Sequence, residues 1–505
     1  MWTTRSYPCE LVPRRKVDYK EPMTPRGPLF LLLLAIPACK VGPTYEIPHM
    51  DLPDRYAWAD TDSTTPPLEP DHWWRQFEDP TLDLIIAIAD EENYDLRIAV
   101  ARVEQYLAEY GIASSELYPD IGVMAQYTRN RTPQEDFTIS GFSLGGTPYN
   151  SWRSGAGASW EIDLFGRIAR AIEAAQGDLQ SSIEDWRYTQ VTMRAEVATS
   201  YIAIRTLQAR LTLARRNIAS QRRWVELVEG QMARGTVTAI TLLQARVSLA
   251  EAEAALPQLG SSLASETASL ALLLGATPGE LDGLLASNER IPVPPGDVSV
   301  GIPADLLRRR PDVRIAERSL AAATARIGEA TAGLYPQLSL TGQFGFGASS
   351  FHEMFQWASR AYTAGPQITW DIFNGDRVRS TINQQNALTR QALLRYERTM
   401  LQAIGEVESS LVGFTLSAQQ RDEFARATAD ARLAYDLSMQ QYEQGVTSAL
   451  NVISALQSLL EVEDVLLQSR GLAAESLVTL YRSLGGGWTP GDLPTLASTS
   501  EDGSS

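Results

Sequence analysis

The sequence contains few of the residues that hold disulfide bonds, metal ions or nucleotides. Its 505 residues include only two cysteines, Cys9 and Cys39, and three histidines, His49, His72 and His352. Two cysteines make no disulfide framework, and a structural zinc site needs about four such ligands. Neither a Walker loop nor a dinucleotide-binding glycine motif occurs. We therefore expect no cofactor and no metal site, and any energy must come from partners.

Positive charge is also in short supply. The chain has 44 Lys and Arg residues against 61 Asp and Glu residues, and its formal net charge is −17 at pH 7. So acidic a chain repels phosphate backbones, and we expect no nucleic-acid binding. Two interpretations of the acidic excess remain open: a charge that keeps the protein soluble, or a lumen that favours cations.

The apolar run near the N-terminus is too short to cross a bilayer. Residues 29–36 are all apolar, whereas a membrane-spanning helix needs about 20 such residues. Arg26 stands before the run and the small residue Ala38 follows it, which is the pattern of a secretory signal. We therefore predict a signal peptide over residues 1–38, with Met23 as a possible true start.

The end of this signal carries a short motif of its own. Residues 35–39, Ala-Ile-Pro-Ala-Cys, resemble a bacterial lipobox, in which the cysteine is acylated and becomes the mature N-terminus. The resemblance implies lipidation of Cys39 and a lipid-anchored extended segment over residues 39–83. In such lipoproteins an aspartate after the cysteine usually means retention at the inner membrane. Lys40 occupies that place here, which favours the outer membrane.

The chain repeats itself internally. Residues 117–119 and 334–336 are both Leu-Tyr-Pro, at an offset of 217 residues, and the Gly235 and Gly445 segments match at an offset of 210. The change of offset falls near residues 130–150, as expected for a loop of altered length. The boundaries follow from these matches: a first repeat over 84–285, a linker rich in Pro and Gly over 286–303, a second repeat over 304–490, and a flexible tail over 491–505.

Proline is missing from two long stretches, residues 149–256 and 367–489. Apolar residues recur there at helical spacing, as at Val197, Tyr201 and Ile204. A helix of about 70 residues from position 166 to 235 would be ~100 Å long, which exceeds the thickness of a bilayer. The stripes are typical of helices packed side by side in water.

The shorter helical segments predicted at 84–116 and 236–274 would together match one long helix, so they can lie end to end beside it. An ordinary periplasmic coiled-coil rod is the alternative, but predicted strands fit it badly. Four segments alternate apolar and polar residues with aromatics near their ends, at 121–128, 152–161, 338–346 and 362–370. Four strands cannot close a barrel, since the smallest membrane barrels have about eight.

Several motifs together resemble the outer-membrane factor family, in its OprM/NodT-type lipoprotein branch, with TolC more distant. The most specific is Pro-Ala-Asp-Leu-Leu-Arg-Arg-Arg-Pro-Asp-Val-Arg at 303–314, and the others are Cys-Lys-Val-Gly-Pro-Thr-Tyr at 39–45, the two Leu-Tyr-Pro motifs and Leu-Gly-Gly-Gly-Trp at 484–488. The motif residues that carry the resemblance between the repeats are Pro303, Leu306, Leu307, Arg310, Pro311 and Asp312.

This resemblance implies a fold and a function. The fold is mainly α with a membrane β-barrel: a homotrimer in which four strands per chain make one shared barrel of 12, above a hollow periplasmic helical tunnel. The function is passive efflux of small molecules such as drugs across the outer membrane. The implied partners are outer-membrane lipid, a periplasmic adaptor and an inner-membrane transporter of the resistance-nodulation-division type. The outer-membrane duct of a type I protein secretion system is the alternative.

One motif would be typical of a hydrolase. Residues 141–145, Gly-Phe-Ser-Leu-Gly, match the nucleophile elbow that would make Ser143 a catalytic nucleophile. That elbow needs a strand–turn–helix setting and a positioned histidine, whereas this segment lies in a loop between two predicted membrane strands. We therefore predict that the chain is not an enzyme; a secreted hydrolase would lose its activity in Ser143→Ala.

The two long hairpins are predicted to turn at glycines, and the family resemblance implies that these tips close the tunnel and meet the adaptor. The tip residues are Arg234, Gly235, Thr236, Gly445, Val446, Thr447 and Ser448. Close relatives often carry an aspartate at the position of Thr447, which would form an acidic ring in a trimer. We predict a gate closed by packing and neutral hydrogen bonds; the alternative is that Glu229, Asp436 or Glu443 supplies the charge.

Overall fold

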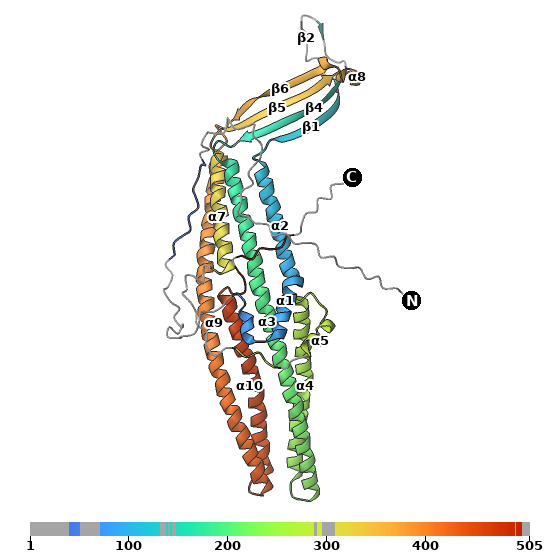
Figure 1. Ribbon diagram of the computed structural model, residues 1–505, viewed down its shortest axis with the longest axis vertical. Coiled ribbons are helices and arrows are strands. Elements are labelled where there is room, and N and C mark those ends of the chain that lie inside the picture. Colours follow the sequence, from blue (N-terminus) through green and yellow to red (C-terminus); the bar gives the residue numbers. More distant parts are fainter. Residues whose placement is uncertain are drawn as a thin grey trace, which may run out of the picture.

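The computed structural model describes residues 40–50, 71–131, 138–139, 142–143, 148–286, 290–294, 309–489 and 491–496. The molecule is elongated, with a β-sheet at one end and two helical tips at the other (Figure 1). Several predicted features lie outside the described residues: the signal peptide, Cys39, Pro303, Leu306, Leu307 and the side chain of Ser143.

Two helices run most of the length of the molecule. They are α3 (Arg167–Ala233) and α9 (Arg377–Glu443), and each has 67 residues. Four shorter helices accompany them: α2 (Tyr94–Ser115) and α7 (Pro311–Ala332) with 22 residues each, and α4 (Ala239–Leu273) and α10 (Ala449–Ser483) with 35 each. The equal lengths confirm the internal repeat. In the described part of the chain, no helix is both long and apolar enough to cross a membrane.

One predicted helix is divided. The segment expected to be one helix over 84–116 forms α1 (Pro80–Glu92) and α2, because Asn93 has an extended backbone with ψ 127°. The Asn93 side chain accepts a hydrogen bond from the Leu96 backbone N–H, which is the geometry of a helix N-cap. The prediction of a continuous helix was therefore wrong at this residue.

The four predicted strands are confirmed. They are β1 (Asp120–Arg131), β4 (Pro148–Ile162), β5 (Gln337–Ala348) and β6 (Arg360–Thr369), antiparallel and in the order β1-β4-β5-β6. A two-residue ribbon of β2 (Thr138–Ile139) and β3 (Phe142–Ser143) lies between β1 and β4 in the chain. The short elements α8 (Phe351–Met354) and η3 (Trp357–Ser359) join β5 to β6.

The helices follow the order of the strands. β1 continues α2, β4 leads into α3, β5 continues α7, and β6 leads into α9. Helix α3 packs against α2, α4, α7 and α10, and α9 packs against α7 and α10. The wall therefore runs α2 with α4, then α3, then α7 with α10, then α9 (Figure 1). Among the described residues, no further long helix packs beside either end of this wall, and the outer edges of β1 and β6 have no partner strand.

A small layer, here called the belt, covers the middle of this wall on one side. It consists of residues 73–92, which contain η1 (Trp73–Phe77) and α1, together with η2 (Pro278–Glu280), α5 (Asp282–Leu285) and residues 487–489 and 491–496. Its Trp73 is buried and stacks on Tyr481 of α10, with ring centroids 5.4 Å apart. On α3, Tyr201 donates a hydrogen bond to Asp79 of the belt at 2.8 Å. The largest apolar core therefore lies at the waist, where belt and wall meet.

Candidate functional site

The strand register sorts the two faces of the sheet by chemistry. One face carries mainly apolar side chains, among them Ile121, Val123, Ala125, Tyr127, Trp152, Ala156, Ala158, Trp160, Leu338, Leu340, Phe344, Phe346, Tyr362 and Ile368. The other carries Gly122, Gln126, Thr128, Arg153, Gly155, Gly157, Ser159, Glu161, Ser339, Thr341, Gln343, Gly345, Gly347, Thr363, Gly365 and Gln367. An apolar outside and a polar inside are what a membrane barrel with a water-filled lumen requires.

The repeated tryptophans join the sheet to the helices. The Trp160 indole donates to the Leu117 backbone carbonyl at 2.9 Å, and the Trp370 indole donates to the Leu334 carbonyl at 3.0 Å. These carbonyls lie just beyond the ends of α2 and α7, where helical carbonyl groups lack partners. The repeated motifs thus have one physical role: each fixes a strand to the end of its helix.

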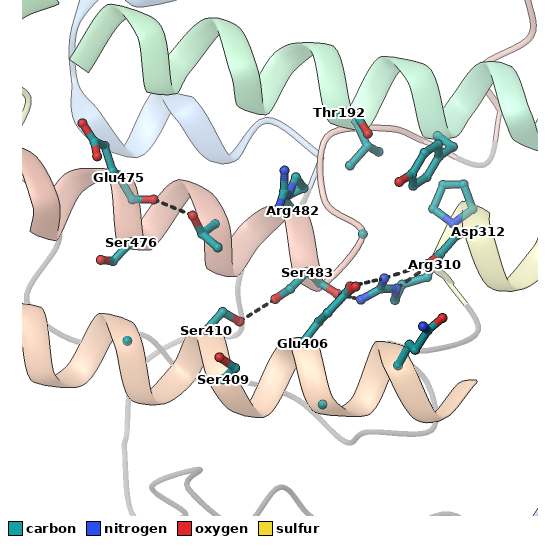
Figure 2. Close-up of a pocket in the computed structure, with 18 of the residues that line it drawn as sticks. Thr192, Arg310, Asp312, Glu406, Ser409, Ser410, Glu475, Ser476, Arg482 and Ser483 are labelled. Atoms are coloured by element: carbon teal, nitrogen blue, oxygen red, sulfur yellow. Dashed lines mark hydrogen bonds and ion pairs between the residues drawn. The ribbon is translucent and has the colours of Figure 1, made fainter. Parts of the chain in front are cut away.

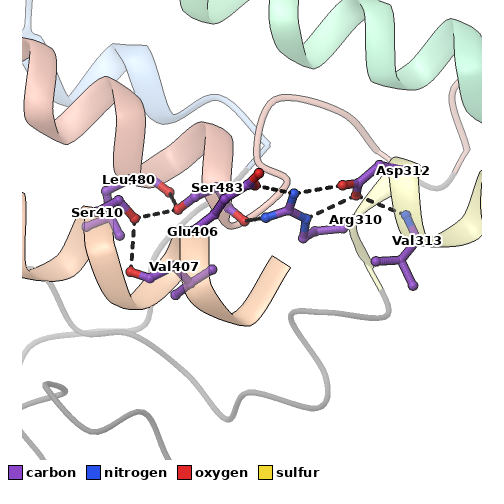
Figure 3. Close-up of polar contacts among 8 residues, drawn as sticks. All are labelled: Arg310, Asp312, Val313, Glu406, Val407, Ser410, Leu480 and Ser483. Carbon is purple, nitrogen blue, oxygen red and sulfur yellow. Dashed lines mark hydrogen bonds and ion pairs between the residues drawn. The ribbon is translucent and has the colours of Figure 1, made fainter. Parts of the chain in front are cut away.

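Below the sheet, a groove of about 710 Å³ opens between α3, α9 and α10 (Figure 2). Arg310 lies in it, only 6% exposed, directly before α7 begins. Its guanidinium donates to the Ser483 carbonyl at 2.7 Å, to the Asp312 carboxylate at 3.0 and 2.7 Å, and to Glu406 at 2.6 Å (Figure 3). Arg310 therefore links the end of α10, the start of α7 and the middle of α9.

The electrostatics of this contact favour the charged arginine. Burial lowers the pKa of the Arg310 guanidinium, but the hydrogen bonds and charges of Asp312 and Glu406 outweigh burial and raise it above its ordinary value. The predicted motif residues Arg310, Pro311 and Asp312 are brought together here. Pro311 is the first residue of α7, where its missing N–H costs no helical hydrogen bond.

The equivalent junction of the first repeat uses an amide. Asn93 is 2% exposed, and its Nδ2 donates to the Leu273 carbonyl at the end of α4 at 2.8 Å. Its Oδ1 accepts from the Leu96 N–H at 2.9 Å and so caps α2. Asn93 was not among the residues predicted from the sequence, although residues 93–95 align with 310–312 at the offset of 217 that the Leu-Tyr-Pro motifs define.

A second groove, of about 640 Å³, lies between α3, α4 and α10, and its charged residues are Glu196, Glu266, Glu475 and Arg482. Burial, followed by the charge of Glu266, raises the pKa of Glu475 to about 7. Ser200 donates a hydrogen bond to Glu266 at 3.2 Å. Glu475 lines both grooves, so it lies between the two helix junctions.

Both grooves open on the side of the wall away from the belt. Tyr201 of α3 reaches the belt, whereas Glu196 lies five residues earlier, about 140° around the helix. Arg194 also faces the belt, where it bonds the Asp90 carboxylate. The face opposite the belt therefore carries the groove carboxylates Glu196, Glu266 and Glu475. Together with the polar face of the sheet, it forms the candidate conducting surface.

The predicted tips lie together at the far end of the molecule (Figure 1). Gly235 and Gly445 have φ of +74° and +72°, values that glycine adopts without strain, and both turns lie where the sequence analysis placed them. After Gly235, the Thr236 hydroxyl donates to the Gln231 carbonyl at 2.9 Å. After Gly445, Thr447 accepts from Asn451 Nδ2 at 2.7 Å, and Val446 is exposed.

Neutral contacts join the two hairpins near the tips. Tyr442 of α9 donates its hydroxyl hydrogen to the Gln231 side chain of α3, and its ring lies 5.6 Å from that of Trp224. Val228 and Val452 belong to the apolar cluster beside this contact. No carboxylate takes part in this hydrogen bond or ring contact.

The charged groups near the tips lie elsewhere. Glu229 is paired with Arg246 at 2.7 Å, while Asp436 and Glu443 are exposed on α9. Arg234 directly follows α3, and Ser448 directly precedes α10. Among the described residues, no His, Cys, Asp or Glu group forms a cluster able to hold a metal ion.

Comparison with known proteins gives consistent matches. A family model described as "Outer membrane efflux protein" matches residues 85–276 and 302–486. The solvent efflux pump outer membrane protein SrpC of Pseudomonas putida is 31% identical over 414 residues, covering 82% of this chain and 87% of that protein. The pyoverdine export outer membrane protein OpmQ of P. putida is 31% identical over 470 residues, covering 92% and 98%.

The fold matches solved structures as well. The outer-membrane channel OprN superposes with a TM-score of 0.80 at 32% identity, covering 89% of this chain and all of that one. The superposition covers most of both chains, so the two proteins share one fold.

Proposed function

Because the chain belongs to the outer membrane efflux protein family, we propose that three copies of it form a passive exit duct for small molecules across the outer membrane. The duct receives its substrates from an inner-membrane transporter of the resistance-nodulation-division type through a periplasmic adaptor. The single observation that carries the proposal is the sheet with one polar and one apolar face, which leads strand by strand into the helical wall.

Three copies complete what one chain leaves open. Unpaired strand edges are not stable in lipid, and β1 and β6 each have one. The outer helices also expose apolar side chains, such as Leu394 and Leu401 on α9 and Leu243 on α4. Joining β6 of one copy to β1 of the next closes a barrel of 12 strands after three copies. Light scattering on the detergent-extracted protein, with the micelle subtracted, should give a trimer; a monomer or dimer would refute this.

The substrate class rests on the relatives, whose names refer to solvents and pyoverdine, both small organic compounds. Expression of the chain with its genomically neighbouring adaptor and transporter should restore export of such compounds in a host lacking its own duct. Ser143→Ala should leave this export unchanged, since we propose no enzymatic step. Export of a large polypeptide instead would favour the type I secretion alternative.

We propose that Cys39 is acylated and anchors the mature N-terminus in the outer membrane. The next residue, Lys40, lies against Gly166, a few residues beyond the end of β4, so the anchor would stand level with the end of the barrel. Several acyl chains give stable anchoring where one does not. Radioactive palmitate should label the wild-type protein but not Cys39→Ser; equal labelling would refute the anchor.

We propose that the tips Arg234–Thr236 and Gly445–Ser448 close the tunnel and dock the adaptor, and that the gate is held by neutral contacts. Support comes from Thr447, which bonds Asn451, and from the Tyr442–Gln231 hydrogen bond between the hairpins. Three hydroxyls bind cations far more weakly than three clustered carboxylates. Micromolar trivalent cations on the periplasmic side should hardly change single-channel conductance, whereas Thr447→Asp should create a block. Strong block of the wild type would show that an acidic ring exists.

A further inference from the structure

The segment after the predicted anchor lies in an ordered position on the helical wall. Residues 40–50, drawn in dark blue in Figure 1, descend from the end of the sheet along the wall toward the waist. At the upper end, Val41 N–H donates to the Phe165 carbonyl at 3.2 Å. At the lower end, Met50 packs on a small apolar cluster that includes Val313 and Met400. The segment therefore contacts both repeats.

A buried arginine depends on this segment for its hydrogen bonds. Arg170 of α3 is only 3% exposed. Its Nε donates to the Val41 carbonyl at 3.1 Å, its Nη2 donates to the Gly42 carbonyl at 3.3 Å, and its Nη1 pairs with Glu173 at 2.9 Å. Without residues 41 and 42, the Nε–H and one Nη2–H of this guanidinium would lose their protein acceptors.

Two glycines make this arrangement possible. A Cβ on Gly42 would lie 2.4 Å from the Cα of Gly328 on α7, and Gly42 has a φ of +89°. A Cβ on Gly328 would in turn lie 2.7 Å from Arg170 Nε. There is thus no room for a methyl group between the segment and the α7 backbone, or between the α7 backbone and Arg170 of α3.

We propose that residues 40–50 act as a strap that ties the first repeat to the second, with Arg170 as its receptor and Gly42 and Gly328 as the pair that admits it. The strap supplies acceptors to a charge on α3 while its backbone packs on α7, so its docking holds the α3–α7 seam together. Tyr45 adds a hydrogen bond to Glu317 of α7 at 3.4 Å. The strap itself needs no acyl group; only its connection to the membrane rests on the acylation of Cys39 proposed above.

Hydrogen exchange on the full-length protein in detergent tests the strap directly. In the wild type, the Val41 amide should be protected, since it is bonded to Phe165. Gly42→Val and Gly328→Ala should each reduce this protection by about tenfold or more, because local undocking exposes the amide. They should also lower the temperature at which the assembly dissociates. Gly42→Ala, which adds a single methyl group at a positive φ, should fall between the wild type and Gly42→Val.

Matched controls separate docking from a general effect of losing glycine. Gly260 of α4 and Gly279 of η2 have open space at the Cβ position, so Gly260→Ala and Gly279→Val should behave like the wild type. Arg170→Met, which keeps an unbranched apolar stem but removes the donors, should expose the Val41 amide as Gly42→Val does. Wild-type protection in Gly42→Val or in Arg170→Met would overturn the strap.

Palmitate labelling, measured on the same samples, keeps the two proposals apart. Strap variants that lose amide protection but keep the label support the strap as a separate device. A wild type that is protected at Val41 but unlabelled would refute the anchor while the strap stands. A labelled wild type whose Val41 amide exchanges freely would refute the strap and leave the anchor in place.

Discussion

The molecule has two helix junctions, one where α2 meets the end of α4 and one where α7 meets the end of α10. They share the same backbone arrangement but differ in the side chain that joins the two helices. At each, the last turn of a lower helix offers a carbonyl, Leu273 in the first repeat and Ser483 in the second, related by an offset of 210 residues. The donor to that carbonyl is Asn93 in one repeat and Arg310 in the other, related by an offset of 217. Both donors stand directly before the upper helix.

The carboxylates around the donor are also duplicated. Asp95 and Glu196 in the first repeat correspond to Asp312 and Glu406 in the second, at the same two offsets. Arg310 bonds both of its carboxylates, whereas the Asn93 amide bonds Leu273 and Leu96 instead. The pKa of Glu196 is raised above its ordinary value, because burial and the charge of Asp95 outweigh the lowering effect of Arg482. At the first junction the neutral Asn93 amide pairs with neither acid, whereas at the second junction Arg310 pairs with both. The two repeats therefore share the geometry of the junction but differ in its charge.

The largest effect is expected from Arg310→Ala. The change leaves the Ser483 carbonyl without its donor and removes the cation from Asp312 and Glu406. Loss of one partner of a buried pair costs about 3–5 kcal/mol, and we expect about 2–3 kcal/mol because Glu406 is 58% exposed. Thermal unfolding followed by circular dichroism measures it. Arg309→Ala, which breaks a more exposed pair with Asp71, is the control and should cost under about 1 kcal/mol.

Breaking the neutral junction of the first repeat should cost less stability. Asn93→Ala removes the cap of α2 and the donor to Leu273, and we expect a loss of about 1–2 kcal/mol in the same measurement. Asn93→Asp keeps the cap acceptor but places a carboxylate oxygen against the Leu273 carbonyl at a buried position, so it should cost at least as much as Asn93→Ala. A loss for Asn93→Ala equal to that for Arg310→Ala would mean that the charge at the second junction adds nothing.

Between the junctions, Glu475 should make stability depend on pH. Its pKa is raised from 4.5 to about 7, so between these values the folded protein holds a proton that the unfolded chain has lost. Stability from this group therefore falls as pH rises from about 4.5 to 7 and stays level above. Unfolding midpoints at pH 5 and pH 8 should show a smaller decrease in Glu475→Gln than in the wild type. Glu91→Gln, at an exposed position on α1, should keep the wild-type difference.

Much of this architecture follows from the sequence because its signals are local and repeated. The long helices are fixed by uninterrupted apolar stripes without proline, and the strands by alternation, so α3, α9 and the four strands lie where the patterns place them. Gly235 and Gly445 mark the tips because a turn with positive φ favours glycine. Such features need no knowledge of what lies across the fold.

The features that sequence reasoning missed all depend on distant partners. Asn93 interrupts an apolar pattern no more than other polar residues do, and its role appears only when the end of α4 is beside it. In the sequence Glu475 cannot be told from the other acidic residues, because its raised pKa depends on burial and on the charge of Glu266. The strap has no periodic pattern at all, since its position is set by the contact of Gly42 with Gly328.

The smallest expected effect lies at a hydroxyl pair that only the second junction has. Ser410 of α9 and Ser483 of α10 are buried with their hydroxyl oxygens 2.7 Å apart, and each also lies within hydrogen-bond distance of a carbonyl three residues earlier in its own helix (Figure 3). A hydroxyl has one hydrogen, so one serine must give up its carbonyl bond to donate to the other.

The pair therefore adds less than two full hydrogen bonds, and Ser410→Ala should cost about 1 kcal/mol or less. Ser417 is a matched control two turns along α9, because it is equally buried and bonds only the Phe414 carbonyl in its own helix. Ser417→Ala should cost less than Ser410→Ala by the value of the inter-helix bond. A double-mutant cycle of Ser410→Ala with Ser483→Ala measures that value as a coupling energy. A coupling of zero would mean that α9 and α10 are joined at this junction by Arg310 and packing alone.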